Sequence, residues 1–273
     1  MPIRTVILDF DGTCTDVEQE AVGFLEGYKR DLAATLGRAH VEDDWQAMEA
    51  RVLASPAEYG MVIGGHMVAP PVDPYLLATA IGTLLGPDLD DEQTERLFKE
   101  NYRFTTTAFK PAARDVVSAL AEADVAFYVV TNSDPVTVGR KLDELAPSRR
   151  DAIRLTGNAR KFLVSEPTEH ASCALFSAVP ETVELAGWQR PIHPRRGHYH
   201  DALRAIWDET DTTPAETLVV GDVFELDLVL PALLGCRVHL ASGPRTLDYE
   251  RAGVEQFGGT HDDDLAAVLA LLA

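Results

Sequence analysis

Short, mostly apolar segments alternate with longer amphipathic segments along most of this chain. Runs rich in Val, Leu and Ile predict strands at Ile3–Leu8, Val125–Thr131, Thr217–Gly221 and Arg237–Ala241. These runs lack polar alternation, as is typical of strands that are buried on both faces. Helical patterns lie between them, at Ala112–Ala123, Pro135–Leu145, Tyr199–Glu209 and Asp227–Leu234. Strands that alternate with helices predict an α/β domain with a mostly parallel sheet.

The segment from Asp16 to Thr107 breaks this alternation. It has helical patterns at Glu18–Leu36, Trp45–Ala54, Tyr75–Leu85 and Glu92–Tyr102, and a Gly- and Pro-rich apolar loop at Tyr59–Pro71. We therefore expect a core domain of residues 1–16 and 108–273 and an inserted helical domain of residues 17–107. At the end of the chain, Asp262–Asp264 precede Leu265–Ala273 and predict an N-capped closing helix.

Composition and charge narrow the class of protein. The 273 residues are 46% hydrophobic and carry a formal charge of −20, which argues against nucleic acid or an anionic membrane as a partner. Cys14, Cys173 and Cys236 are few and far apart, which favours a reducing cytoplasm over a disulfide framework. No apolar run approaches the roughly 20 residues that span a bilayer. We expect a soluble cytoplasmic protein.

The first predicted strand ends in Asp9-Phe10-Asp11-Gly12-Thr13, which places two carboxylates at positions i and i+2 before a glycine turn. In a regular strand both side chains would point to the same side. Two carboxylates at such a short distance repel each other unless a positive group lies between or beside them. Magnesium prefers one or two protein carboxylates together with water and substrate phosphate. The motif therefore indicates metal-assisted phosphoryl chemistry.

Two further polar motifs follow predicted strands. Thr131-Asn132-Ser133-Asp134 precedes a helix that Pro135 could begin, and Gly221-Asp222 opens a turn that leads to Asp227. A hydroxyl and backbone N–H groups at a strand-to-helix turn can hold a phosphate. In such sheets ligands bind at the carboxyl ends of the strands, so the three motifs should meet at one edge. Any one of them alone could be only a helix cap and a turn.

The three motifs, in this order and spacing, resemble those of the haloacid dehalogenase superfamily of phosphohydrolases, and the resemblance covers the whole chain. It implies a Rossmann-like, doubly wound parallel-sheet core. The insertion after the first motif resembles the helical cap of phosphoglycolate-phosphatase-like members. The resemblance also implies a magnesium-dependent phosphatase that hydrolyses a small phosphorylated metabolite, a phosphomonoester, through an aspartyl-phosphate.

Residue by residue, the resemblance implies that Asp9 is the nucleophile and that Asp11 is the general acid and later the base. Thr131 would hydrogen-bond the transferring phosphoryl group. Asp222 would ligate the metal with support from Asp227. The expected metal ligands are Asp9, Asp11 (through its backbone carbonyl), Asp222 and Asp227. The expected substrate-binding residues are Gly12, Asn132, Ser133, Lys161 and His66.

The weakest part of the resemblance is the cation that members of the family carry between the second and the last of these motifs. The family usually has a lysine shortly before the last motif, where this chain has His193-Pro194-Arg195-Arg196. Arg196 is the favoured candidate because arginine can clamp carboxylate or phosphate with two hydrogen bonds. Lys161, in a longer than usual stretch between the second and last motifs, is its rival.

Several alternatives stay open. A phosphomutase would use the same nucleophile, a degenerate member would only bind ligands, and a dehalogenase would need no second acid at Asp11. His193, His198 and His200 could form a transition-metal site, although no carboxylate or cysteine completes it locally. The loop Tyr59–Pro71 could touch substrate, with His66 as its best polar candidate, or form an apolar seam. The inserted helices could also serve as the surface of a homodimer.

Overall fold

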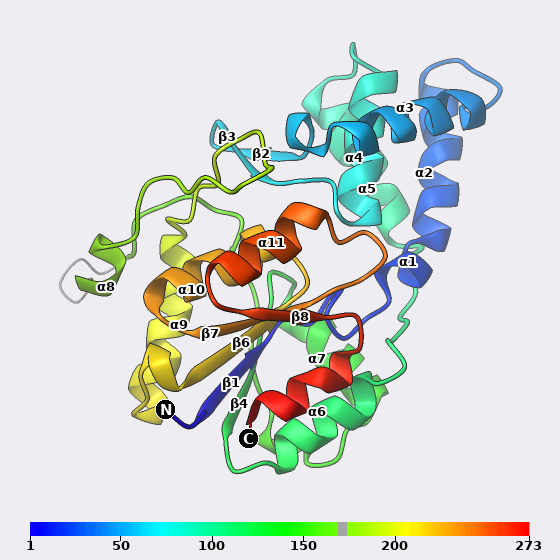
Figure 1. The fold of residues 1–273 in the computed structure, drawn as a ribbon. Coiled ribbons are helices and arrows are strands. Elements are labelled where there is room, and N and C mark those ends of the chain that lie inside the picture. The colour runs from blue at the N-terminus through cyan, green and yellow to red at the C-terminus, as the bar shows by residue number, and fades with distance from the viewer. Residues whose placement is uncertain (169–173, 273) are drawn as a thin grey trace. The chain divides into compact units, whose positions relative to one another are not determined.

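The computed structural model describes residues 1–168 and 174–272 and divides the chain into two compact units (Figure 1). One unit consists of residues 1–15, 63–68 and 109–273, and the other of residues 16–62 and 69–108. The assignment of residues 63–68 to the first unit differs from the sequence prediction, which placed them in the inserted helical domain. Cys173 lies outside the described residues. Within them, no helix combines the length and apolar character needed to cross a membrane.

A six-stranded parallel sheet forms the centre of the first unit. Its strands lie in the order β5-β4-β1-β6-β7-β8. Their bounds are β1 Thr5–Leu8, β4 Ala126–Val130, β5 Arg154–Thr156, β6 Thr217–Gly221, β7 Arg237–Ala241 and β8 Thr260–Asp262. The four predicted strands are present, in a Rossmann-like α/β core. The edge strands β5 and β8 escaped prediction because each is three residues long and has no apolar run.

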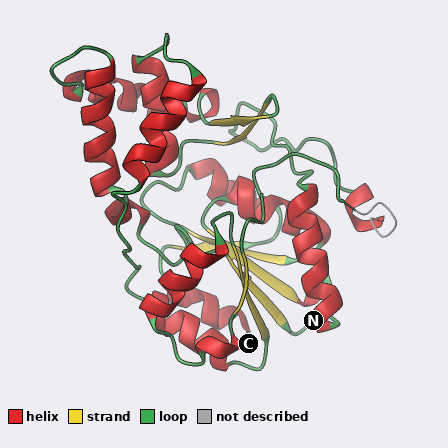
Figure 2. Cartoon of the chain, turned by 180° about the vertical axis from the view of Figure 1, so that it is seen from behind, coloured by secondary structure: helices red, strands yellow, loops and turns green. Residues whose placement is uncertain are grey.

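Helices cover both faces of this sheet (Figure 2). One face packs against α6 (Ala113–Glu122), α7 (Pro135–Leu145) and a closing 3₁₀ helix (Leu265–Leu272). The other packs against α9 (Gly197–Thr210), α10 (Val229–Leu234) and α11 (Asp248–Gln256). A short helix, α8 (Ala174–Ser177), lies in the chain between the β5 loop and α9. The closing segment is 3₁₀ rather than the α-helix that its capping pattern predicts.

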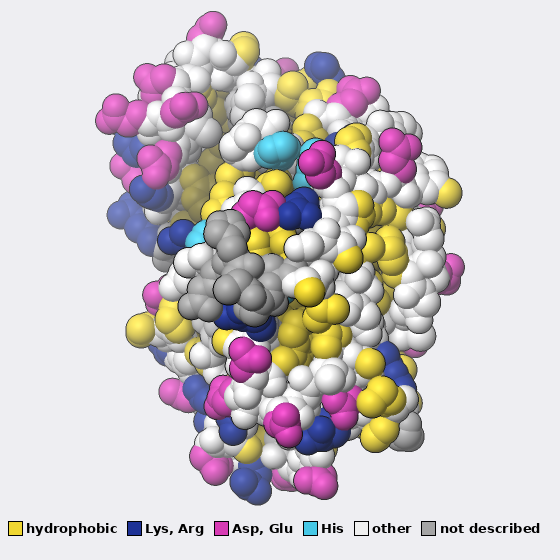
Figure 3. All heavy atoms as spheres, turned by 90° about the vertical axis from the view of Figure 1, so that its left-hand side faces the viewer, with side chains coloured by type: hydrophobic (Ala, Val, Ile, Leu, Met, Phe, Trp, Pro, Cys, Tyr) yellow, Lys and Arg dark blue, Asp and Glu magenta, His cyan; other side chains and the backbone are white. Residues whose placement is uncertain are grey.

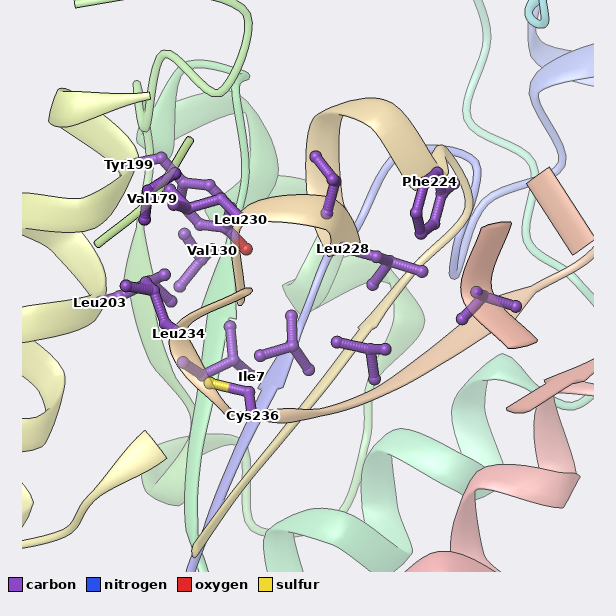
Figure 4. Packing of buried hydrophobic residues seen from close by; sticks show 14 of the residues in the cluster. Ile7, Val130, Val179, Tyr199, Leu203, Phe224, Leu228, Leu230, Leu234 and Cys236 are labelled. Atoms are coloured by element: carbon purple, nitrogen blue, oxygen red, sulfur yellow. The ribbon is translucent and has the colours of Figure 1, made fainter. Parts of the chain in front are cut away.

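Alternating side chains of the strands explain how one sheet supports two apolar layers. Ile7 belongs to the layer under α9 and α10, whereas its neighbours Val6 and Leu8 belong to the layer under α6 and α7. Figure 4 shows Ile7 together with Leu203 and Leu234, which belong to the layer under α9 and α10. Because both faces are buried, the strands carry continuous apolar runs, which is why the sequence revealed them.

The second unit is helical, with a two-stranded hairpin at its boundary. Its helices are α1 (Val17–Glu20), α2 (Val22–Thr35), α3 (Glu42–Ala54), α4 (Pro74–Leu85) and α5 (Asp91–Tyr102). Phe24, Tyr28 and Trp45 are buried at its centre. The hairpin pairs β2 (Met61–Ile63) with β3 (His66–Ala69) inside the segment expected to be a loop. Gly64 and Gly65 turn it with φ values of 60° and 82°, which a two-residue hairpin turn requires.

Two arginines of the segment before α9 hold the end of this hairpin within the first unit. Arg190 donates to the carbonyl of Met67, at 3.2 Å, and to both carboxylate oxygens of the fully buried Glu225, at 2.9 and 2.6 Å. Arg196 donates to the carbonyl of Val68, at 3.3 Å. These bonds are the physical reason why residues 63–68 depart from the predicted domain boundary.

We expect Arg190→Met to lower the free energy of unfolding of the first unit by about 3 kcal/mol, because it leaves the Glu225 carboxylate buried without its closest partner. Urea denaturation followed by fluorescence measures this loss. Arg149→Met is the matched control, since Arg149 pairs with Asp151 where both side chains are exposed. An equal effect of the two substitutions would contradict the assigned role of the Arg190–Glu225 pair.

Candidate active site

The three polar motifs meet at the carboxyl edge of neighbouring strands. Leu8, the last residue of β1, pairs with Val129 of β4 on one side and with Val220 of β6 on the other. Asp9, Thr131 and Asp222 therefore leave the sheet side by side. Asp9 is anchored there by a hydrogen bond from its backbone N–H to the carbonyl of Val220, at 2.8 Å. The sequence prediction placed the motifs at this edge, and the strand pairing brings them together there.

The turn after β1 requires glycine at position 12. Gly12 has φ of 82°, and a Cβ atom there would lie 2.1 Å from Oδ2 of Asp222. Thr13, which the sequence analysis did not single out, is buried, and its hydroxyl lies 3.3 Å from Oδ2 of Asp9 and 3.2 Å from Oδ1 of Asp222. Gly12 thus lets Asp222 approach the first motif, and Thr13 links the two carboxylates.

Three carboxylates form a compact cluster at this edge. Asp9, Asp222 and Asp227 each place an oxygen within 4.8 Å of the others. Burial raises the pKa of Asp9 well above its usual value, and repulsion from Asp227 and Asp222 adds to it. Burial and the charge of Asp227 raise the pKa of Asp222 to about 8. The cluster is short of positive charge, and its hard oxygen donors suit a divalent cation such as Mg²⁺.

Asp227 reaches the cluster through an unusual turn. The sequence predicts an α-helix over Asp227–Leu234, but residues Phe224–Leu228 form a π-helical turn and α10 begins only at Val229. The wider turn folds Asp227 back, so that its Oδ2 accepts a hydrogen bond from the backbone N–H of Val223, at 3.0 Å. Single π-helical turns of this kind are frequent at functional sites.

The cation in contact with Asp9 is Lys161, not Arg196. Lys161 Nζ lies 2.5 Å from Oδ1 of Asp9 and 2.8 Å from Oδ1 of Asp227, and the side chain is buried. Burial alone would lower the pKa of Lys161, but Asp227 and Asp9 outweigh it and raise the pKa. Arg196 instead donates to the carbonyls of His193 and of Lys161, at 2.7 and 2.8 Å. The preference for Arg196 is therefore corrected.

The short strand β5 explains this correction. Lys161 lies in the loop after β5, and β5 ends at the same sheet edge as β4. The loop is fixed there by hydrogen bonds from the backbone N–H groups of Asn158 and Ala159 to the carbonyls of Ser133 and Thr131, both at 3.0 Å. Arg196 also helps to fix Lys161, because its guanidinium group donates to the backbone carbonyl of Lys161.

The second motif contributes mainly by ordering its neighbours. Asn132 accepts a hydrogen bond from the backbone N–H of Lys161, at 2.7 Å. The hydroxyl of Thr131, almost fully buried, accepts one from the backbone N–H of Ser133, at 3.1 Å. The hydroxyl of Ser133 donates to Oδ2 of Asp11, at 2.6 Å.

Asp11 stands apart from the three-carboxylate cluster. Its Oδ1 accepts a hydrogen bond from Lys141 Nζ, at 2.8 Å, so both of its carboxylate oxygens have a protein donor. The sequence analysis missed Lys141. The available signal was its position in α7, where it shares a buried stripe with Val138, Leu142 and Leu145.

His193, His198 and His200 do not form the transition-metal site that the sequence left open. The ring of His66 packs edge-on against that of His193, with 4.5 Å between centroids. Burial, followed by the charge of His66, lowers the pKa of His193. Among the described residues, the one group of three or more potential metal ligands is the carboxylate cluster. His198 and His200 belong to no second group there.

On the face shown in Figure 3, acidic and basic side chains are interspersed rather than separated by sign. The cluster of three carboxylates at the ends of β1 and β6 differs from this face, because it gathers acidic groups at one place.

Comparisons with known proteins agree with this fold. A model of the haloacid dehalogenase-like hydrolase family matches residues 3–229. A predicted phosphoglycolate phosphatase from Haemophilus somnus is 14% identical, with 99% of this chain and 98% of that chain covered and a TM-score of 0.54. The magnesium-bound Bacillus subtilis protein YfnB, described as a HAD-hydrolase, is 14% identical, with coverages of 100% and 99% and a TM-score of 0.55.

A HAD-superfamily hydrolase from Geobacter sulfurreducens is 16% identical, with coverages of 99% and 97% and a TM-score of 0.53. Among curated proteins, no match was found. The family match extends over most of the chain and includes all three motifs. The chain therefore belongs to the haloacid dehalogenase-like hydrolases.

Proposed function

We propose that this hydrolase is a magnesium-dependent phosphatase that acts on a small phosphomonoester through an aspartyl-phosphate intermediate. The observation that carries the proposal is the separation of two kinds of carboxylate at one sheet edge. Asp9 lies in a buried cluster with Asp222 and Asp227, whereas Asp11 is held outside it by Ser133 and Lys141. One group is placed to attack and to hold a cation, and the other to move protons.

In the first step, an oxygen of Asp9 bonds to phosphorus as the ester P–O bond breaks, and the leaving oxygen takes a proton from Asp11. In the second step, the oxygen of a water molecule bonds to phosphorus as the bond between Asp9 and phosphorus breaks, and the water gives a proton to Asp11. Phosphate leaves and the carboxylate of Asp9 is restored. Lys161 holds Asp9 in place for the attack. Thr131, at the end of β4, is placed to contact the phosphoryl oxygens.

The residues present fit a magnesium ion. Lys161 pairs with two of the three carboxylates, Asp9 and Asp227, so the cluster retains negative charge when all three are ionised. Asp9, Asp222 and Asp227 would hold the ion, and the bound ion would neutralise charge on the phosphoryl group. In support of this proposal, the structurally similar YfnB is described as bound to magnesium.

The residues disfavour two of the other functions considered for this fold, a dehalogenase and a ligand-binding protein without activity. A carbon-centred dehalogenase needs neither a second acid at Asp11 nor a cluster of three carboxylates. A ligand-binding protein without activity would have no use for Lys161 bridging two buried carboxylates. A phosphomutase would use the same residues and differs only in where the phosphoryl group goes.

Phosphate release from p-nitrophenyl phosphate and from a panel of phosphorylated metabolites tests the proposal. We expect magnesium-dependent release that a chelator stops. Absence of release across the whole panel would refute a phosphatase. Transfer between positions of a sugar phosphate without net release would identify a mutase, and chelator-resistant halide release from a 2-haloacid would identify a dehalogenase.

Asp222→Asn should have opposite effects on stability without and with magnesium. Without the ion, the substitution removes a partly buried carboxyl group whose pKa burial and Asp227 raise to about 8; because its protonation at neutral pH opposes folding, the melting temperature should rise. Magnesium should raise the melting temperature of the parent protein but not that of the variant. Asp208→Asn, on the exposed side of α9, is the control. A parent-like magnesium response in Asp222→Asn would exclude Asp222 as a ligand.

A further inference from the structure

Lys141 lies on the buried face of α7, where lysine is unusual. Val138, Leu142 and Leu145 share that face, and Lys141 is itself only 7% exposed. Lysine is almost never buried without a partner. Its ammonium group lies 2.8 Å from Oδ1 of Asp11. Helix α7 therefore brings a cation to the second acid of the site.

The Asp11 carboxylate is held at both oxygens by one continuous stretch of chain. Oδ1 accepts from Lys141 and Oδ2 from the hydroxyl of Ser133, at 2.6 Å. Ser133 is fixed in turn by its backbone bond to Thr131. Asp134 then caps α7, accepting hydrogen bonds from the backbone N–H groups at the helix start. Donors on two oxygens fix both the position and the rotation of the carboxylate.

Stability alone does not explain this arrangement. The Asp11 side chain is 28% exposed, so its carboxylate stays hydrated without the lysine. Loss of the lysine leaves a partly exposed carboxylate, so it should cost less stability than loss of one partner from a fully buried ion pair. Methionine at position 141 would keep the apolar stem packed against α7. The effect of removing the ammonium group should therefore be seen in the chemistry of Asp11 more than in folding.

We propose that Lys141 is a positioning residue that holds Asp11 in the orientation from which it transfers protons. This inference rests on the proposed phosphatase function. In the first step, the proton of Asp11 passes to the ester oxygen as the P–O bond breaks. A leaving group that is stable as an anion needs little of this help, whereas an alkoxide needs much of it. Loss of Lys141 should therefore be selective for poor leaving groups.

The test compares kcat/KM for p-nitrophenyl phosphate with kcat/KM for the best alkyl phosphate from the metabolite panel. Lys141→Met should lower the second value about 10²-fold, the scale of a misplaced proton donor, and the first by no more than a few-fold. Lys141→Arg keeps a donor and should recover part of the loss. Arg140→Met, its neighbour on the exposed side of α7, should change neither value.

Two results would overturn the inference in a parent protein that is active. Unchanged kinetics in Lys141→Met would show that Asp11 needs no such partner. An equal loss for both esters, expressed in KM, would show that Lys141 binds substrate directly. If the parent protein releases phosphate from neither ester, the proposed function and this inference both fall. Melting curves of the three variants show whether each is folded.

Discussion

Asp9→Asn should lower phosphate release at least about 10⁴-fold, the scale on which loss of a covalent nucleophile acts. The amide of asparagine is nearly isosteric with the carboxylate but is too weak a nucleophile to attack phosphorus. Lys161 keeps Asp227 as a partner, so the variant should fold. Steady-state phosphate release and trapping of acid-stable phosphoprotein from a labelled substrate measure the two consequences. Both signals should disappear together.

The control for this substitution is Asp16→Asn. Asp16 lies seven positions further along the chain, and its side chain caps the short helix α1. It should lose little more than the stability of a helix cap, about 1 kcal/mol, and keep its activity. Parent-like turnover by Asp9→Asn would disprove a nucleophilic role for Asp9.

Lys161→Met and Arg196→Met should fail in different ways. Lys161→Met leaves Asp9 and Asp227 buried without a cation, so stability should fall by about 3–5 kcal/mol and activity of the folded protein by about 10²-fold or more. Arg196→Met removes bonds to backbone carbonyls and should lower stability, with at most about a tenfold loss of activity in the folded protein.

Urea denaturation and kcat at saturating magnesium separate these effects. If Lys161→Met does not fold, Lys161→Arg takes its place, since it keeps the charge but cannot reproduce the single contact point of the ammonium group. A folded Arg196→Met protein without activity, beside an active Lys161→Met, would return the catalytic cation to Arg196.

The sequence predicts the strands that are buried on both faces of the sheet, but not the short strands at its edges. Strands β1, β4, β6 and β7 are buried on both faces and carry continuous apolar runs, so the sequence predicts them. Strands β5 and β8 lie at the edges and have three residues each. Helix α11 is mostly polar and contributes only Tyr249 and Val254 to the apolar layer that it covers. Pairing with a neighbouring strand, rather than an intrinsic pattern, defines β5 and β8.

The candidate site follows the same division. Asp9, Asp222 and Thr131 could be placed from sequence because each directly follows a readable strand. Lys161 could not, because its strand β5 was not recognised, and nearness to the last motif in the chain favoured Arg196 instead. Lys141 needed the packing of α7, which turns one face of the helix inward.

The hydrogen bonds that hold residues 63–68 limit how this protein can be shortened. A direct fusion of residues 1–15 to residues 109–273 would delete the helices and the end of the hairpin together. Arg190 and Arg196 would then lose the carbonyls of Met67 and Val68 as acceptors. Excision of the insertion at the boundary predicted from sequence would also remove hydrogen bonds of the first unit. A shortened protein must therefore keep the hairpin, or Arg190 and Arg196 must be replaced.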